Sequence, residues 1–195
     1  MDFNHDSSWD NLLEVFNLKL SITDSWNKII NFHEKIIWKP YWNDLRQLEF
    51  VSEQNEIKEW LEHFVKNSDL PPSVLALWIG ILKMEYNGKL SPTIYIVGSD
   101  TYIKNSNEWA SQPIYVPDNR YAIPGILGQI DDIVKADNKN YEFFDWILPL
   151  AYCALTFDDI IRTKLDTNLF LKSRNKIHVV TGHDSGDYLE LSCIK

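Results

Sequence analysis

The densest group of chemically reactive side chains lies in residues 182–187, GHDSGD, close to the end of the chain. His183, Asp184 and Asp187 place an imidazole beside two carboxylates, and the glycines of this stretch permit tight backbone geometry. Such a group could bind a metal ion or carry out acid–base chemistry. It lacks the alternating oxygen ligands and the final glutamate of a calcium loop, and no HExxH or HxxxH partner occurs elsewhere. We therefore interpret it as the acidic tip of a β-hairpin.

No other arrangement of residues in the sequence is typical of catalysis. The remaining histidines share no ligand spacing, GxSxG is absent, and the 7 glycines form no phosphate-binding loop. Two pairs of acids are adjacent, at 131–132 and at 158–159, but neighbouring helical positions point in different directions and do not share a proton. We expect a protein that is not an enzyme and that needs no cofactor and no metal.

Helices are predicted for the N-terminal part of the chain, about residues 1–68, and again from residue 126. Ser52 opens the clearest amphipathic helix, with an apolar stripe on one side. The side that we expect to face solvent carries Glu53, Glu56, Glu59 and Glu62. In the later helical region, Pro149 is expected to kink or divide a helix.

Two β-hairpins are predicted between and after these helices. The apolar run 74–84 ends before a Gly-containing turn, and the β-branched run 93–99 follows, which favours two strands over a buried helix. Gly80 inside the first run indicates a bulge or a close approach of another group. A second pair of strands would flank residues 182–187. The sequence thus predicts one α+β domain, residues 1–195, with helices packed on a mainly antiparallel sheet that contains both hairpins.

The charge and the cysteines limit the partners and the compartment. A net charge of −9 argues against nucleic acid as a ligand. Residues 1–70 hold 13 acidic against 7 basic side chains, an excess that either attracts a basic protein partner or serves only solubility. No basic start is followed by an apolar segment, and no apolar run is long enough to span a membrane. Cys153 and Cys193 lie in apolar surroundings without CxxC spacing, so we expect free thiols in a cytoplasmic protein.

Five stretches together resemble a group of small bacterial immunity proteins that accompany polymorphic or contact-dependent toxins. They are ALWIG at 76–80, IYIVGS at 94–99, EWA at 108–110, PDNRY at 117–121 and GHDSGD at 182–187. In that group an aromatic residue usually precedes the closing Asp-x-Gly-Asp, whereas this chain has His183. The resemblance implies a cytoplasmic protein that binds and neutralises the C-terminal toxic domain delivered by a neighbouring cell, without a catalytic set.

The interface residues are predicted from charge and from expected exposure. The turn-rich connection 99–125 supplies Tyr102 and Trp109 as aromatic anchors. The acidic rim would consist of Asp131, Asp132, Asp184 and Asp187. A basic toxin domain, a nuclease in particular, would suit such a rim. The alternatives to an immunity protein are another intracellular binding or adaptor protein and an enzyme without a known motif.

Overall fold

The computed structural model describes residues 2–184 and 186–195, so Ser185 of the predicted hairpin tip lies outside the described residues. The helices are α1 (His5–Asn17), α2 (Ile22–Ile36), α3 (Trp42–Arg46), α4 (Phe50–Asn67), α5 (Gly125–Val134), α6 (Tyr141–Thr163) and α7 (Thr167–Leu171), with the short 3-10 turn η1 (Glu108–Ser111). The strands are β1 (Ala76–Tyr86), β2 (Lys89–Ser99), β3 (Tyr121–Ala122), β4 (His178–His183) and β5 (Tyr188–Glu190).

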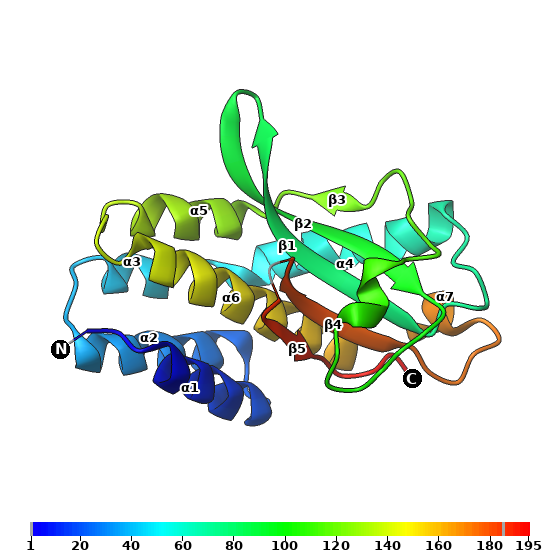
Figure 1. Ribbon diagram of the computed structural model, residues 1–195, viewed down its shortest axis with the longest axis horizontal. Coiled ribbons are helices and arrows are strands. Elements are labelled where there is room, and N and C mark those ends of the chain that lie inside the picture. Colours follow the sequence, from blue (N-terminus) through cyan, green and yellow to red (C-terminus); the bar gives the residue numbers. More distant parts are fainter. Residues whose placement is uncertain (1, 185) are drawn as a thin grey trace.

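The strands form one sheet in the order β3-β2-β1-β4-β5. The pair β1 and β4 is parallel, and the other three pairs are antiparallel. Both predicted hairpins are present, as β1–β2 and β4–β5, and the far end of the β1–β2 hairpin projects beyond the body of the protein (Figure 1). The predicted α+β fold with a mainly antiparallel sheet is confirmed.

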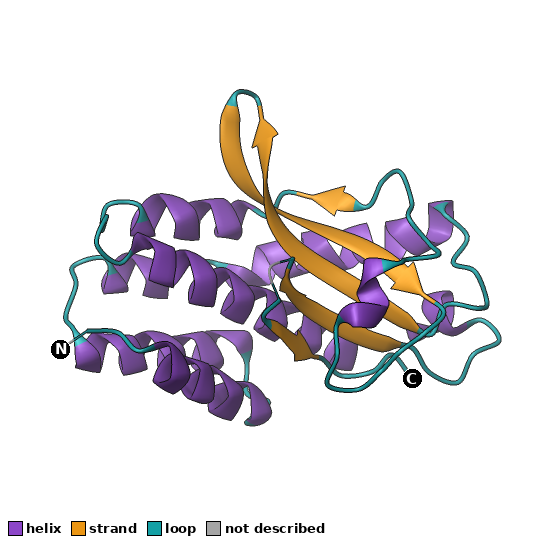
Figure 2. Cartoon of the chain, in the orientation of Figure 1, coloured by secondary structure: helices purple, strands orange, loops and turns teal. Residues whose placement is uncertain are grey.

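The two faces of the sheet are covered differently. Helices lie on one face, here called the inner face, where α6 packs against β4 and α5 against β2, while α1 and α2 pack on α6 in turn (Figure 2). The large hydrophobic core lies among these helices and against the inner face of the sheet, and its residues range from Leu12 to Ile194. The segment that carries η1 covers the opposite, outer face and encloses a smaller cluster around Trp78, Trp109 and Val180. The sheet is therefore buried on both sides along part of its length.

Local signals in the sequence explain where the helices begin and continue. The side chain of Asn4 caps α1 by accepting from the Ser7 amide at 2.9 Å, and Ser21 caps α2 by accepting from the Asp24 amide at 3.1 Å. Pro149 does not divide α6, which runs unbroken over 23 residues. Since proline lacks the N–H that would bond to the carbonyl of residue 145, the turn around this carbonyl must find other partners.

Two expectations about burial were wrong for α4. Glu53 and Glu62 are buried rather than solvated. Glu53 accepts from the Ile126 amide at 2.9 Å, which caps the start of α5, and also from the Tyr152 hydroxyl. Glu62 accepts from the amide of Asp166 and pairs with Lys58. Carboxylates that meet donors from distant segments can be buried, and a helical pattern does not reveal those donors.

None of the helices that the structure describes combines the length and the apolar character that crossing a bilayer requires.

Candidate functional site

The site develops from a row of residues that face each other across the sheet. Tyr95, Gly80, Gly182 and Tyr188 are successive partners on β2, β1, β4 and β5. A Cβ atom on Gly80 would lie 2.0 Å from the Tyr95 ring, so the ring lies directly over this glycine, and a Cβ on Gly182 would lie 2.5 Å from Tyr188. The strand register is continuous at Gly80, so the predicted alternative of a close approach is correct and the bulge is not.

The position of the Tyr95 ring lets its hydroxyl reach the turn after β4. It donates a hydrogen bond to Asp184 at 2.6 Å. Burial and the neighbouring Asp184 carboxylate raise the pKa of Tyr95, so the phenol remains protonated and remains a donor at neutral pH. Gly80 thus leaves room for the ring whose hydroxyl positions an acidic side chain at the end of β4.

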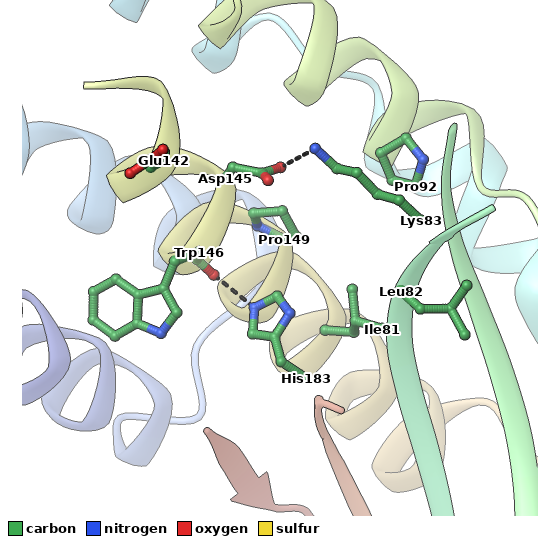
Figure 3. Close-up of a pocket in the computed structure, with 9 residues that line it drawn as sticks. All are labelled: Ile81, Leu82, Lys83, Pro92, Glu142, Asp145, Trp146, Pro149 and His183. Atoms are coloured by element: carbon green, nitrogen blue, oxygen red, sulfur yellow. Dashed lines mark hydrogen bonds and ion pairs between the residues drawn. The ribbon is translucent and has the colours of Figure 1, made fainter. Parts of the chain in front are cut away.

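The turn is also attached to α6 on the inner face of the sheet. The imidazole of His183 lies 2.8 Å from the carbonyl oxygen of Trp146, next to the turn that Pro149 disturbs (Figure 3). A carbonyl can only accept, so Nε2 of His183 carries the proton. The indole N–H of Trp146 donates in turn to Asp187 at 2.8 Å, and the His183 amide donates to the carbonyl of Asp187 at 2.9 Å.

Four cavities open around this turn, with volumes of about 250, 400, 420 and 260 Å³. His183 lines two of them and Asp187 lines two. We call their combined lining the turn surface. Among the described residues it holds seven carboxylates and one lysine. The carboxylates are Asp6, Glu108, Glu142, Asp145, Asp184, Asp187 and Glu190, and the lysine is Lys83.

Lys83 offsets little of this negative charge, because it pairs with one of the seven carboxylates, Asp145, and with the buried Asp131. Its ammonium lies 2.6 Å from Asp145 and 3.0 Å from Asp131, and it also donates to the hydroxyl of Tyr141 at 2.6 Å. Burial opposes its charge, but these hydrogen bonds outweigh burial and raise the pKa of Lys83. A lysine that is protonated at neutral pH is neither a nucleophile nor a general base. The first cavity therefore lacks the activated amine that amine-based covalent chemistry requires.

In the part of the chain that the structure describes, no group of three or more histidine, cysteine, aspartate or glutamate side chains has the geometry to hold an ion. Of the three residues that a metal site in the turn would use, His183 and Asp187 form hydrogen bonds with Trp146, and Asp184 accepts one from Tyr95.

Two of the predicted rim residues belong to the turn surface. Asp184 and Asp187 are both exposed and lie on either side of residue 185. Asp132 is exposed as well, but it pairs with Lys89 at 2.9 Å and lines none of the four cavities in the described residues.

The predicted exposure of three other residues needs correction. Trp109 is 5% exposed and packs against Trp78, where its indole N–H donates to the carbonyl of Ser106. Tyr102 is half-buried and stacks on His178 with ring centroids 3.7 Å apart.

Asp131 is 2% exposed, and Lys83, Lys135 and Tyr141 all donate to it. Burial opposes its charge, but these hydrogen bonds prevail and lower the pKa of Asp131. These three side chains secure the fold and do not form a free anchor or rim.

The aromatic side chains that do reach the turn surface were not predicted from the sequence. They include Trp9 of α1, Trp146 of α6 and Tyr95 of β2. Each lies in an ordinary helix or strand pattern, and only the distant contacts with residues 183–187 distinguish them from core residues.

No protein-family model, no curated protein and no solved structure matches this chain. The site is therefore interpreted from its own geometry.

Proposed function

We propose that this protein is a bacterial immunity protein, which binds the C-terminal toxic domain of a contact-dependent or polymorphic toxin in the cytoplasm and neutralises it. The observation that carries the proposal is the turn surface, where seven carboxylates line four cavities and the one lysine among the described lining residues pairs with one of them, Asp145. A surface of this charge attracts a basic protein and speeds its encounter. Nuclease domains are basic because they bind phosphates, so a nuclease fits this description best.

Aromatic groups within the acidic surface support binding of a protein rather than of small cations alone. The half-buried indole of Trp146 and the partly buried ring of Tyr188 lie beside the exposed carboxylates of the turn. Aromatic anchors surrounded by a polar rim are the usual composition of a tight protein interface. The turn is also held by several hydrogen bonds, so little conformational entropy is lost when a partner binds.

The test is co-expression with the toxin domain encoded in the neighbouring reading frame. We expect the protein to prevent growth arrest and to co-elute with the toxin domain from a sizing column. The double variant Asp184→Lys, Glu142→Lys reverses two exposed charges of the turn surface and should abolish both effects at physiological salt.

A matched control reverses two charges elsewhere. Glu59 and Asp132 are exposed and line none of the four cavities within the described residues, so Glu59→Lys, Asp132→Lys should still protect the cell. If the unmodified protein neither protects nor co-elutes, the immunity function is refuted, and an intracellular adaptor becomes the better hypothesis. If both double variants fail equally, net charge matters but the turn surface is not the interface.

A further inference from the structure

One of the four cavities has a composition that suits a single kind of side chain. It measures about 260 Å³, lies between the start of α1 and α6, and is lined by His5, Asp6, Trp9, Trp146 and Asp187. We call it the indole slot. Two of its walls are indoles and two of its edges carry carboxylates, which is the combination that attracts an organic cation.

The indoles are arranged almost in parallel. The ring centroids of Trp9 and Trp146 are 6.4 Å apart, and the planes of the rings are inclined by 22°. His5 lies one turn before Trp9 on the same face of α1, and its ring centroid is 4.6 Å from that of Trp146. The Trp146 indole extends from α6 away from Lys83 and Asp145, so that pair does not supply the slot with a cation (Figure 3).

The carboxylates are fixed to different extents. One oxygen of Asp187 accepts the indole N–H of Trp146 at 2.8 Å, which holds the ring in place and leaves lone pairs on the carboxylate for another donor. Asp6 is exposed in the first turn of α1. No lysine or arginine lines the slot among the described residues, and the one basic side chain in its lining there is the imidazole of His5, so no permanent cation of the chain faces the two carboxylates within the lining.

We propose that the indole slot binds an arginine side chain, presented by the protein partner. A guanidinium is planar, stacks on aromatic faces and donates to carboxylates in a fixed fork, whereas the ammonium of lysine is compact and strongly hydrated. Nearly parallel indoles with a carboxylate beside them match the first shape better than the second. The identity of the partner rests on the proposed function, but the preference of the slot for a guanidinium does not.

The slot can be tested without the toxin, with N-acetyl-arginine amide as the probe. The indole N–H of Trp146 gives one NMR resonance, which is assigned as the signal that disappears in Trp146→Phe. If that variant folds, the indole signals of the other tryptophans should stay in place. We expect the probe to shift this resonance with a dissociation constant of roughly 10 mM, as a few contacts would give. N-acetyl-citrulline amide, which has the same shape without the charge, should bind at least about fivefold more weakly.

Amide variants separate the slot from the overall charge. The double variant Asp6→Asn, Asp187→Asn removes two charges from the slot and keeps an oxygen for the Trp146 indole. We expect it to weaken the binding of the arginine probe about fivefold or more. Glu59→Gln, Asp132→Asn removes the same net charge at exposed positions away from the slot and should change binding less than about twofold. Equal binding of citrulline and arginine amides, equal effects of the two double variants, or no shift of the Trp146 resonance would each overturn the proposal.

The same variants distinguish this inference from the proposed function. If the toxin domain binds, and Asp6→Asn, Asp187→Asn weakens this binding far more than the matched control does, the immunity function and the assignment of the slot both stand. If the probe binds in the slot but the toxin domain does not bind at all, the slot stands and the immunity function falls. If the toxin domain binds equally well to both double variants, the immunity function stands, and the assignment of the slot to an arginine of the partner is overturned.

Discussion

The buried histidine of α2 should make the stability of this protein fall in mild acid. His33 is fully buried, its Nδ1 lies 2.9 Å from the carbonyl oxygen of Ile29, and its Nε2 lies 3.1 Å from the hydroxyl of Ser8. The carbonyl can only accept, so Nδ1 carries the proton and Nε2 accepts from Ser8. The imidazole is therefore neutral, and burial lowers the pKa of His33 to about 4.

The sign of the effect follows from the two pKa values. Between pH 6.5 and about 4 the unfolded chain binds a proton at His33 and the folded protein does not, so the free energy of unfolding falls as the pH falls through this range. The fall in the pKa of His33 from 6.5 to about 4 corresponds to a loss of about 3 kcal/mol in the free energy of unfolding. This loss is complete near pH 4 and is absent above pH 6.5. No reduction for solvent screening applies, because the ring has no exposed surface.

The assay is urea unfolding at pH 7 and at pH 4. His33→Gln should lower the free energy of unfolding by about 1 to 2 kcal/mol at pH 7, because buried hydrogen bonds are lost. Between the two pH values, however, the variant should lose about 3 kcal/mol less than the unmodified protein. His63 is exposed on α4, and His63→Gln serves as the control that leaves the pH dependence unchanged. An identical pH dependence in His33→Gln, or an NMR titration of His33 with a midpoint near 6.5, would refute the reasoning.

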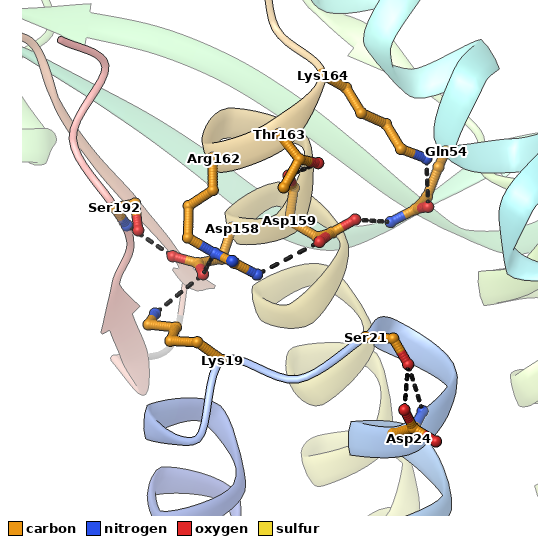
Figure 4. Close-up of polar contacts among 10 residues, drawn as sticks. All are labelled: Lys19, Ser21, Asp24, Gln54, Asp158, Asp159, Arg162, Thr163, Lys164 and Ser192. Atoms are coloured by element: carbon orange, nitrogen blue, oxygen red, sulfur yellow. Dashed lines mark hydrogen bonds and ion pairs between the residues drawn. The ribbon is translucent and has the colours of Figure 1, made fainter.

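Three further predictions concern other parts of the fold. Asp158 is 2% exposed and accepts from Lys19, Arg162 and the amide of Ser192 (Figure 4). In a urea titration, Asp158→Ala should therefore reduce the free energy of unfolding by about 2 to 3 kcal/mol. The control Asp159→Ala, at a more exposed position, should reduce it by about 1 kcal/mol or less. Burial raises the pKa of the Cys153 thiol, so mass spectrometry after treatment with a thiol reagent should find native protein modified at the half-buried Cys193 and unmodified at Cys153 until it unfolds. Gly80→Ala would place a methyl group in the space that the Tyr95 ring occupies and should lower the free energy of unfolding by about 1 to 3 kcal/mol. A variant as stable as the original protein would show that the ring does not need this position.

Local patterns predicted the elements of the fold well. The hairpin β1–β2 could be predicted because an apolar run and a β-branched run flank a turn with Asn87 and Gly88, and both residues have positive φ in the structure. The parallel pairing of β1 with β4 could not, since more than 100 positions separate Ala76 from His178 and no periodicity encodes the choice of neighbour. Sequence spacing reports which face of an element is apolar, but not which element covers it.

The same limit explains the errors at the site. Asp131 is buried because Lys83, 48 positions earlier in the chain, extends from β1 to meet it. Trp109 is buried because the connection that carries it folds back over the outer face of the sheet. Asp184 and Asp187 could be identified because their exposure follows from the turn itself, whereas the contact of Trp146 with Trp9 joins two helices and leaves no trace in either segment.

The turn after β4 is held from both faces of the sheet, and this bears on which carboxylates would contribute most to the proposed binding of a basic partner. Tyr95 reaches Asp184 across the outer face because Gly80 leaves room for its ring, while Trp146 reaches Asp187 from the helical layer on the inner face. Glu142 lines the same surface from the exposed side of α6. A carboxylate that is already oriented loses less side-chain entropy when a cationic partner arrives, and the donor that orients it leaves lone pairs available. Asp184 and Asp187 should therefore govern the lifetime of a complex, while Glu142 contributes mainly to the long-range attraction that salt screens.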